Sequence, residues 1–111
     1  MVSRNESSME ITDQEFNEVI NNSHKLVFVD FFAEWCMPCL MIAPVIEDLA
    51  SEMKEVKFVK INVDDNRELA EKYVISSIPC MILFRDGKEV DRIIGNQTAE
   101  NIEKKIKKHL D

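Results

Sequence analysis

Glycine is scarce in this sequence, with only two residues in 111. Loops that hold the phosphates of nicotinamide or flavin dinucleotides need glycines at fixed spacing, as in GxGxxG. No such motif is present, and no second domain is long enough to supply one. We therefore expect the chain to hold no cofactor.

Cysteine is also in short supply. The three residues, Cys36, Cys39 and Cys80, are an odd number and fall short of a disulfide-stapled scaffold, which favours a reducing compartment, the cytoplasm. A structural zinc ion requires four ligands. The sequence offers one close cysteine pair, one distant cysteine, and His24 and His109 far apart, so we expect no metal site.

Long apolar runs and excess positive charge are missing as well. No segment approaches the roughly 20 apolar residues of a membrane span, and the polar N-terminus lacks the apolar core of a signal peptide. The formal net charge of −7 disfavours nucleic acid and anionic membranes as partners. We expect residues 1–7 to be a flexible tail and residues 8–111 to form a single domain.

The most informative stretch is residues 26–39, which read LVFVDFFAEWCMPC. Its first half is a nearly continuous apolar run of β-branched and aromatic residues, which predicts a strand buried on both faces. After Cys39 the apolar residues recur at helical spacing. The two cysteines are therefore expected where a strand is followed by a helix.

This position favours thiol chemistry. The first turn of a helix carries unpaired backbone N–H groups and the positive end of the helix dipole, which stabilise a thiolate at Cys36. Cys39 lies three residues further on, on the same helix face, where it could resolve a mixed disulfide formed at Cys36. Pro38 suits a first helical turn because it has no N–H to leave unpaired.

The cysteine pair has two structural alternatives. A purely structural disulfide would close a loop of only four residues and stabilise by about 2 kcal/mol, against about 3 kcal/mol for a fifteen-residue loop. Half of a zinc site would lack its other ligands. A lone CxxC beside a βαβ pattern is itself typical of a redox pair, so redox chemistry is the favoured interpretation.

The rest of the chain predicts alternating strands and helices. Strands separated by helices are expected to pair in parallel, and Asp86-Gly87 predicts a tight hairpin that adds an antiparallel pair. The fold class is therefore α/β, with a mixed central β-sheet flanked by helices on both faces. The expected strands are 9–11, 26–32, 56–63, 80–84 and 89–94, and the expected helices are 12–22, 39–55, 64–73 and 98–110.

Several motifs of the sequence occur in the same order and at the same spacing in the thioredoxin family. The sequence resembles that family from about Ile11 to Leu110. The resemblance implies the thioredoxin fold. The shared motifs are VDFFAEWCMPC, Ala43-Pro44, Ile78-Pro79, the hairpin Phe84-Arg85-Asp86-Gly87, and Gly95.

The resemblance implies roles for residues at the reaction centre. Cys36 would be the attacking thiol and Cys39 the resolving, more buried one. Asp30 matches a buried family aspartate that helps proton transfer at the second cysteine, and Lys60 matches the lysine near it. Independently, a carboxyl group inside an apolar strand is expected to have a raised pKa and to act as an acid or base near neutral pH. The alternative is an Asp30 side chain that points out of the strand end.

The resemblance also implies a substrate-binding surface around a cis peptide bond before Pro79, although only about 5–6% of X–Pro bonds are cis. The Ile78 backbone would then face the disulfide and offer hydrogen bonds to an extended substrate segment. Trp35 could instead fill the core, because tryptophan is usually mostly buried. The surface would comprise Trp35, Met37, Pro38, Ile78, Pro79, Ile94 and Gly95.

Three positions depart from the family pattern. Phe32 stands where many relatives have tryptophan, a change that is expected to conserve packing. Met37 replaces the glycine that is usual between the first cysteine and the proline, which could alter partner choice and reduction potential. Cys80 stands where threonine is common. It is expected to be a buried small hydrophobe, with a third exchangeable thiol near the disulfide as the alternative.

Together these features predict a thioredoxin-type protein-disulfide reductase. It would reduce protein disulfides by dithiol-disulfide exchange through Cys36 and Cys39, and a separate reductase of the thioredoxin reductase type would restore the dithiol. A monomer is expected. The alternatives are a glutaredoxin-like or oxidant role, which Met37 leaves open, and a binding module that uses the fold as a scaffold with its cysteines idle.

Overall fold

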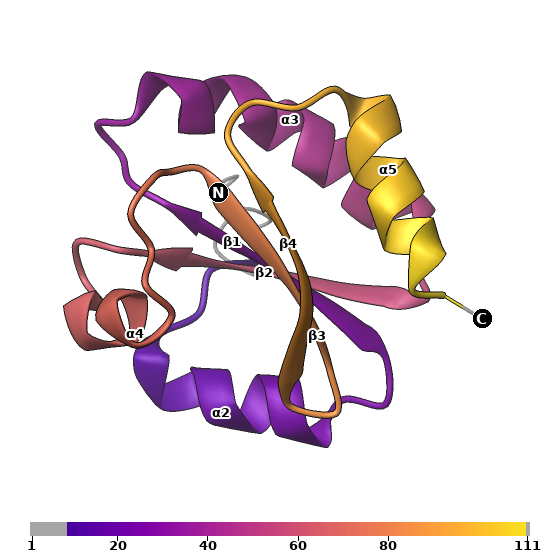
Figure 1. Cartoon of the computed structure of the whole chain (residues 1–111), viewed down its shortest axis with the longest axis horizontal. Coiled ribbons are helices and arrows are strands. Elements are labelled where there is room, and N and C mark those ends of the chain that lie inside the picture. The colour runs from indigo at the N-terminus through magenta and orange to yellow at the C-terminus, as the bar shows by residue number, and fades with distance from the viewer. Residues whose placement is uncertain (1–8, 111) are drawn as a thin grey trace, which may run out of the picture.

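A four-stranded β-sheet forms the centre of the molecule, and the computed structural model describes residues 9–110 (Figure 1). The strands are β1 (Leu26–Phe32), β2 (Val56–Asn62), β3 (Cys80–Arg85) and β4 (Lys88–Ile94). They lie in the order β2-β1-β3-β4, so β1 and β3 are inner strands and β2 and β4 are the edges. The pairing of β1 with β2 is parallel and the other pairings are antiparallel, so the sheet is mixed, as predicted.

Helices cover both faces of this sheet, which also confirms the prediction. The described helices are α2 (Asp13–Asn22), α3 (Met37–Glu52), α4 (Arg67–Lys72) and α5 (Ala99–Lys108). α3 and α5 lie on one side of the sheet and α2 and α4 on the other (Figure 1). One apolar cluster contains Phe28 with Ile46 of α3 and Ile106 of α5, and a second contains Val29 with Phe16 of α2. None of the helices in the described part is long and apolar enough to cross a membrane.

Strand β1 is buried on both faces, as its apolar run predicts. Every residue from Leu26 to Phe31 is buried. Successive side chains point to opposite faces, so Phe28 joins the α3 and α5 side while Val29 joins the α2 and α4 side. By the same alternation Asp30 lies on the α3 side of the sheet. The strand thus places one carboxyl group beneath the helix that follows it.

The direction of β3 differs from the prediction. Parallel pairing is correct for β1 and β2, which α3 separates, but wrong for β3, which follows α4 and runs antiparallel to β1. α4 has six residues and spans about 9 Å, whereas a strand such as β2, with seven residues, spans about 23 Å. Because α4 is too short to carry the chain back along the sheet, β3 begins near the end of β2 and runs in the reverse direction.

The predicted edge strand at 9–11 is wrong in extent. Within the described residues, Glu10 forms one isolated parallel bridge with Lys60, and the Ile11 N–H donates to the Lys60 carbonyl at 2.9 Å. The chain then enters α2, where the Thr12 N–H donates to the Glu15 carboxylate at 2.9 Å, as in a capping box. The predicted flexible tail, residues 1–7, lies outside the described residues.

The predicted hairpin at Asp86-Gly87 joins β3 to β4. Both residues have positive φ, 53° and 81°, as a two-residue turn of this kind requires. At Gly87 an added Cβ atom would also require the exposed Asn21 side chain to move. The hairpin returns the chain toward the start of β3, where the Gly95 N–H donates to the Pro79 carbonyl at 2.8 Å.

Candidate active site

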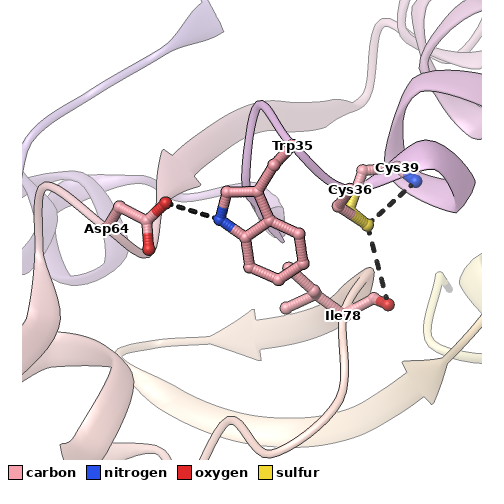
Figure 2. Close-up of a disulfide and its surroundings, with 5 residues drawn as sticks. All are labelled: Trp35, Cys36, Cys39, Asp64 and Ile78. Carbon is pink, nitrogen blue, oxygen red and sulfur yellow. Dashed lines mark hydrogen bonds between the residues drawn. A yellow bond between two sulfur atoms is a disulfide. The ribbon is translucent and has the colours of Figure 1, made fainter.

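Cys36 and Cys39 lie where β1 is followed by α3, as predicted (Figure 2). Cys36 is the N-cap residue of α3 and Cys39 lies in its first turn, after Pro38. A disulfide joins the two residues, whose Cα atoms are 5.2 Å apart. The Cys39 backbone N–H donates to Cys36 Sγ at 3.2 Å. The sulfur therefore takes the place of the side-chain oxygen that usually caps a helix.

Burial does not distinguish the two cysteines. Their exposed fractions are 3% for Cys36 and 4% for Cys39, so the expectation of a more buried Cys39 is wrong in this disulfide form. Their surroundings differ instead, because Cys36 lies between the exposed Trp35 and Met37 and its Sγ is 3.9 Å from the Ile78 carbonyl oxygen.

Cys39 borders a pocket of about 580 Å³ that Asp30 and Lys60 also line. Asp30 is buried, and its Oδ1 has no hydrogen-bond partner in the described part of the chain. Burial raises the pKa of Asp30 from 3.8 to about 7, and the positive charge of Lys60 opposes that rise. The carboxyl group can therefore gain or lose a proton near neutral pH. An Asp30 that points out of the strand end is excluded.

Lys60 reaches this pocket from β2. Its Cα pairs with that of Asp30 across the parallel ladder, and its Nζ lies 5.0 Å from the centroid of the Phe32 ring. The ammonium group is thus held between an aromatic face and the pocket. This position explains why Lys60 favours the ionised form of Asp30.

The loop before β3 faces Cys36 from the opposite side (Figure 2). The peptide bond between Ile78 and Pro79 is cis, as the family resemblance implies. Pro79 itself is buried, while Ile78 and Gly95 are half-buried. Pro79 therefore offers little contact area, and its carbonyl instead holds Gly95 beside Ile78 through the hydrogen bond described above.

Apolar side chains are exposed around the disulfide. Trp35 is 71% exposed, so the alternative that it fills the core is wrong. Met37 and Ile94 are also exposed. The indole Nε1 of Trp35 donates to Asp64 Oδ2 at 2.7 Å, which fixes the ring beside the disulfide (Figure 2). The site is therefore a shallow apolar surface with the two sulfurs at its centre.

The family model for Thioredoxin matches residues 7–108 of this chain. The chain belongs to the thioredoxin family. A thioredoxin of Chlamydia pneumoniae is 48% identical over 99 residues, which cover 89% of this chain and 95% of the relative. The X-ray structure of Fasciola hepatica thioredoxin superposes with a TM-score of 0.83 at 43% identity, covering 89% of this chain and 95% of the other. A thioredoxin of Staphylococcus epidermidis is 44% identical over 92% of this chain and 97% of its own.

Membership in the thioredoxin family gives the chain its activity. It is a thiol-disulfide oxidoreductase that reduces protein disulfides through the Cys36–Cys39 pair. The family also implies disulfide substrates and a reductase that returns electrons to the pair. Among residues 9–110, no group of three or more His, Cys, Asp or Glu side chains lies together in a way that could hold a metal ion.

The third cysteine lies apart from the pair. Cys80 is 1% exposed and belongs to the apolar cluster on the α2 and α4 side of the sheet, whereas Asp30 lies on the α3 side and Cys39 is part of α3 itself. Burial raises the pKa of the Cys80 thiol. The prediction of a buried small hydrophobe is confirmed, and the alternative of an exchangeable third thiol has no accessible sulfur to support it.

Sequence reasoning missed three residues near the site. One is Asp64, because no local pattern connects it with Trp35, 29 positions away. The other two are Leu40 and Met41, apolar residues that follow Cys39 in α3 and are both exposed. The exposure of Leu40 could have been predicted, because at about 100° per residue Leu40 lies about 200° around the helix from the buried Ile42, on the opposite face.

Proposed function

We propose that Cys36 is the attacking thiol of this reductase. Its thiolate attacks one sulfur of a substrate disulfide, a mixed disulfide forms, and the other substrate sulfur leaves as a thiolate. The observation that best supports this assignment is the hydrogen bond from the Cys39 N–H to Cys36 Sγ. A donor at the positive end of a helix stabilises negative charge on that sulfur.

In the second step, Cys39 attacks the Cys36 sulfur of the mixed disulfide. The Cys36–Cys39 disulfide forms, the substrate leaves reduced, and the electron pair has passed from the protein dithiol to the substrate. Asp30 accepts the proton that Cys39 must lose to attack. Their shared pocket supports this role, as does the pKa of Asp30 near 7, while Lys60 favours the ionised carboxylate that accepts the proton.

The substrate segment lies extended across the apolar surface around the disulfide. The Ile78 carbonyl, close to Cys36 Sγ, is placed to accept a hydrogen bond from the backbone of that segment. Its side chains then contact exposed apolar groups rather than enter a deep cavity, which suits proteins better than small molecules. The proposed contact surface comprises Trp35, Met37, Pro38, Ile78, Ile94 and Gly95, with Pro79 holding its centre in place.

The experiment that tests these roles compares serine variants of all three cysteines in the reduction of insulin disulfides. Cys36→Ser and Cys39→Ser should both abolish catalysed turnover, since each breaks the dithiol. Cys80→Ser is the matched control and should retain turnover per folded molecule. Reduced Cys39→Ser should also accumulate a mixed disulfide with the substrate, visible by intact mass. Accumulation by Cys36→Ser instead would mean that the roles of the pair are reversed.

The partner, location and assembly complete the proposal. A thioredoxin reductase-type enzyme is the electron donor, and the protein works in the cytoplasm, which fits its few cysteines.

Residues 8–111 act as one domain and as a monomer, which the net charge of −7 supports through repulsion between copies. Sedimentation of the reduced protein should give the mass of one chain. A dimer at micromolar concentration would contradict that part.

A further inference from the structure

A groove of about 620 Å³ lies between β4 and α5, next to the proposed substrate surface. Three lysines of α5 line it, Lys104, Lys105 and Lys108, and no acidic residue is among its lining residues. Arg92 of β4 also borders it, but the Arg92 guanidinium lies on the α4 side of the sheet, where its Nη2 donates to the Tyr73 carbonyl at 3.0 Å. The lining residues also include Ile94, which is exposed and belongs to the proposed substrate surface. In a chain with a net charge of −7, this is a local concentration of positive charge.

Only part of this charge is balanced within the protein. Arg92 Nε pairs with Glu89 at 2.7 Å, and Lys105 Nζ lies 3.5 Å from Asp91. Across residues 9–110, neither Lys104 nor Lys108 forms an ion pair. Lysines near the negative, C-terminal end of α5 interact favourably with the helix dipole, but this interaction depends only on the distance from the helix end. It therefore does not explain why Lys104 and Lys108 lie on the face of α5 that lines the groove.

The groove is suited to side chains and not to an added strand. β4 is an edge strand, and such edges can pair with a partner's backbone. Here, however, the Arg92 N–H donates to Asp91 Oδ1 at 2.8 Å, and the Ile94 carbonyl accepts from Gln97 Nε2 at 3.2 Å. Because these backbone groups are already satisfied, a partner gains most by placing carboxylates near Lys104 and Lys108.

Building on the function proposed above, we propose that this groove binds acidic side chains that flank the disulfide of a protein substrate. A segment that crosses Ile94 on its way from Cys36 enters the groove directly. Acidic residues elsewhere on a substrate are repelled by the net negative charge, whereas those in the groove meet unpaired lysines. Because the Debye length is about 8 Å at physiological ionic strength, the position of the acidic residues, not the total charge of the substrate, decides the preference.

The test uses peptides that differ only beside their single disulfide, with two Asp or two Asn residues on the N-terminal or C-terminal side. The protein is reduced with dithiothreitol, desalted, and mixed with each peptide, so no reductase is needed. Its second-order oxidation rate should be roughly three- to tenfold higher with Asp than with Asn on one of the two sides, the range expected for two exposed charge pairs. The preference should shrink as salt is raised.

Two double variants with the same charge change locate the effect. Lys104→Gln with Lys108→Gln should remove the preference for Asp while leaving the rate with Asn peptides unchanged. Lys54→Gln with Lys57→Gln, at the other edge of the sheet, should keep it. No preference in the wild type, or equal losses in both double variants, would overturn the proposal.

A second measurement separates this proposal from the proposed function. The oxidised protein is titrated with the Asp and Asn peptides in which serine replaces cysteine, and amide shifts of α5 are followed by NMR. Shifts at Asn101 and Lys104 that are larger with Asp support the groove whether or not the peptides are reduced. If all peptides are reduced poorly but the Asp peptide still causes the larger shifts, the proposed function is wrong and the binding of acidic side chains by the groove is supported. Equal shifts with the Asp and Asn peptides would overturn the proposal for the groove.

Discussion

Cys36 and Cys80 are both almost fully buried, yet their surroundings differ in the feature that controls thiol reactivity. The Cys36 sulfur accepts a backbone N–H at the start of α3 and borders the exposed Trp35 and Met37. The Cys80 sulfur belongs to an apolar cluster in the core, where burial raises its pKa by more than the nearby Arg92 lowers it. The comparison shows that exposed area alone does not identify a reactive cysteine. The position of the sulfur does so, because Cys36 lies at the start of a helix beside exposed side chains and Cys80 lies inside the core.

Two carboxyl groups, those of Asp30 and Asp91, also differ in their surroundings and therefore in their pKa. Asp30 is buried as deeply as the cysteines, but it borders a pocket and lacks a hydrogen-bond partner for one oxygen in the described residues. Asp91, in contrast, accepts hydrogen bonds from His109 and the Arg92 N–H, which help to lower its pKa. The first arrangement favours proton exchange, and the second favours a fixed charge.

Alkylation rates should show the largest difference between the two cysteines. We expect iodoacetamide to modify Cys36 of the reduced protein on the order of 1,000-fold faster than Cys80 at pH 7, because Cys80 reacts only when the core opens. Mass mapping after timed quenching measures both rates in one sample. Comparable alkylation rates for Cys36 and Cys80 would contradict the conclusion that their surroundings give them different reactivities.

The stability of the oxidised protein should depend on Asp30 and on pH. The unfolded carboxyl ionises above 3.8, but the folded one ionises only above about 7. Between these values the folded state binds more protons, so wild-type stability falls as pH rises. Asp30→Asn removes this loss, and at pH 8 its free energy of unfolding should be higher by about 4 kcal/mol. Urea unfolding at pH 4 and pH 8 measures the change. A wild-type curve that is flat over this range would mean that Asp30 is not desolvated.

The rate of the resolving step should also depend on Asp30. Asp30→Asn should slow release of the mixed disulfide roughly 100-fold at pH 7, a typical contribution of a positioned base. The deficit should narrow above pH 8.5, where a thiol ionises without help. Quenched-flow measurement of mixed-disulfide decay gives these rates. Asp65→Asn makes the same change on an exposed residue and should leave them unaltered; an identical deficit at all pH values would indicate a structural role instead.

The smallest effect is expected at Cys80. Cys80→Ser buries a hydroxyl in an apolar cluster and should lower the free energy of unfolding by about 1–3 kcal/mol, while kcat/KM of the folded protein stays within about twofold of wild type. Cys80→Ala serves as the control without a polar group. A loss of activity in both variants would place Cys80 in the reaction and contradict its assignment to the core.

Local patterns in the sequence predict the centre of the site well. The apolar run from Leu26 to Phe32 identifies a doubly buried strand, and the change to helical spacing after Cys39 places both cysteines at the start of a helix. Asp30 stands out because it interrupts that run. These features depend on residues close together in the chain, where periodicity and capping act directly.

Features that depend on packing between distant segments could not be predicted in this way. The direction of β3 follows from the length of α4 relative to the sheet, which the sequence pattern alone does not fix. The contact between Trp35 and Asp64 joins two loops through one hydrogen bond. Equal burial of Cys36 and Cys39 results from the disulfide and the loop before β3, not from their own sequence neighbours.

The cap at the start of α3 makes the reacting sulfur part of the helix that carries it. An oxygen N-cap contributes about 1 kcal/mol to a helix, and the more weakly accepting Cys36 Sγ occupies that position here. Helix order and redox state are then thermodynamically coupled, and such coupling is reciprocal. A substitution that stabilises the first turn of α3 therefore also favours the redox state in which Cys36 Sγ is the better N-cap. The reduction potential of the pair is thus adjustable from positions along the helix that never contact a substrate.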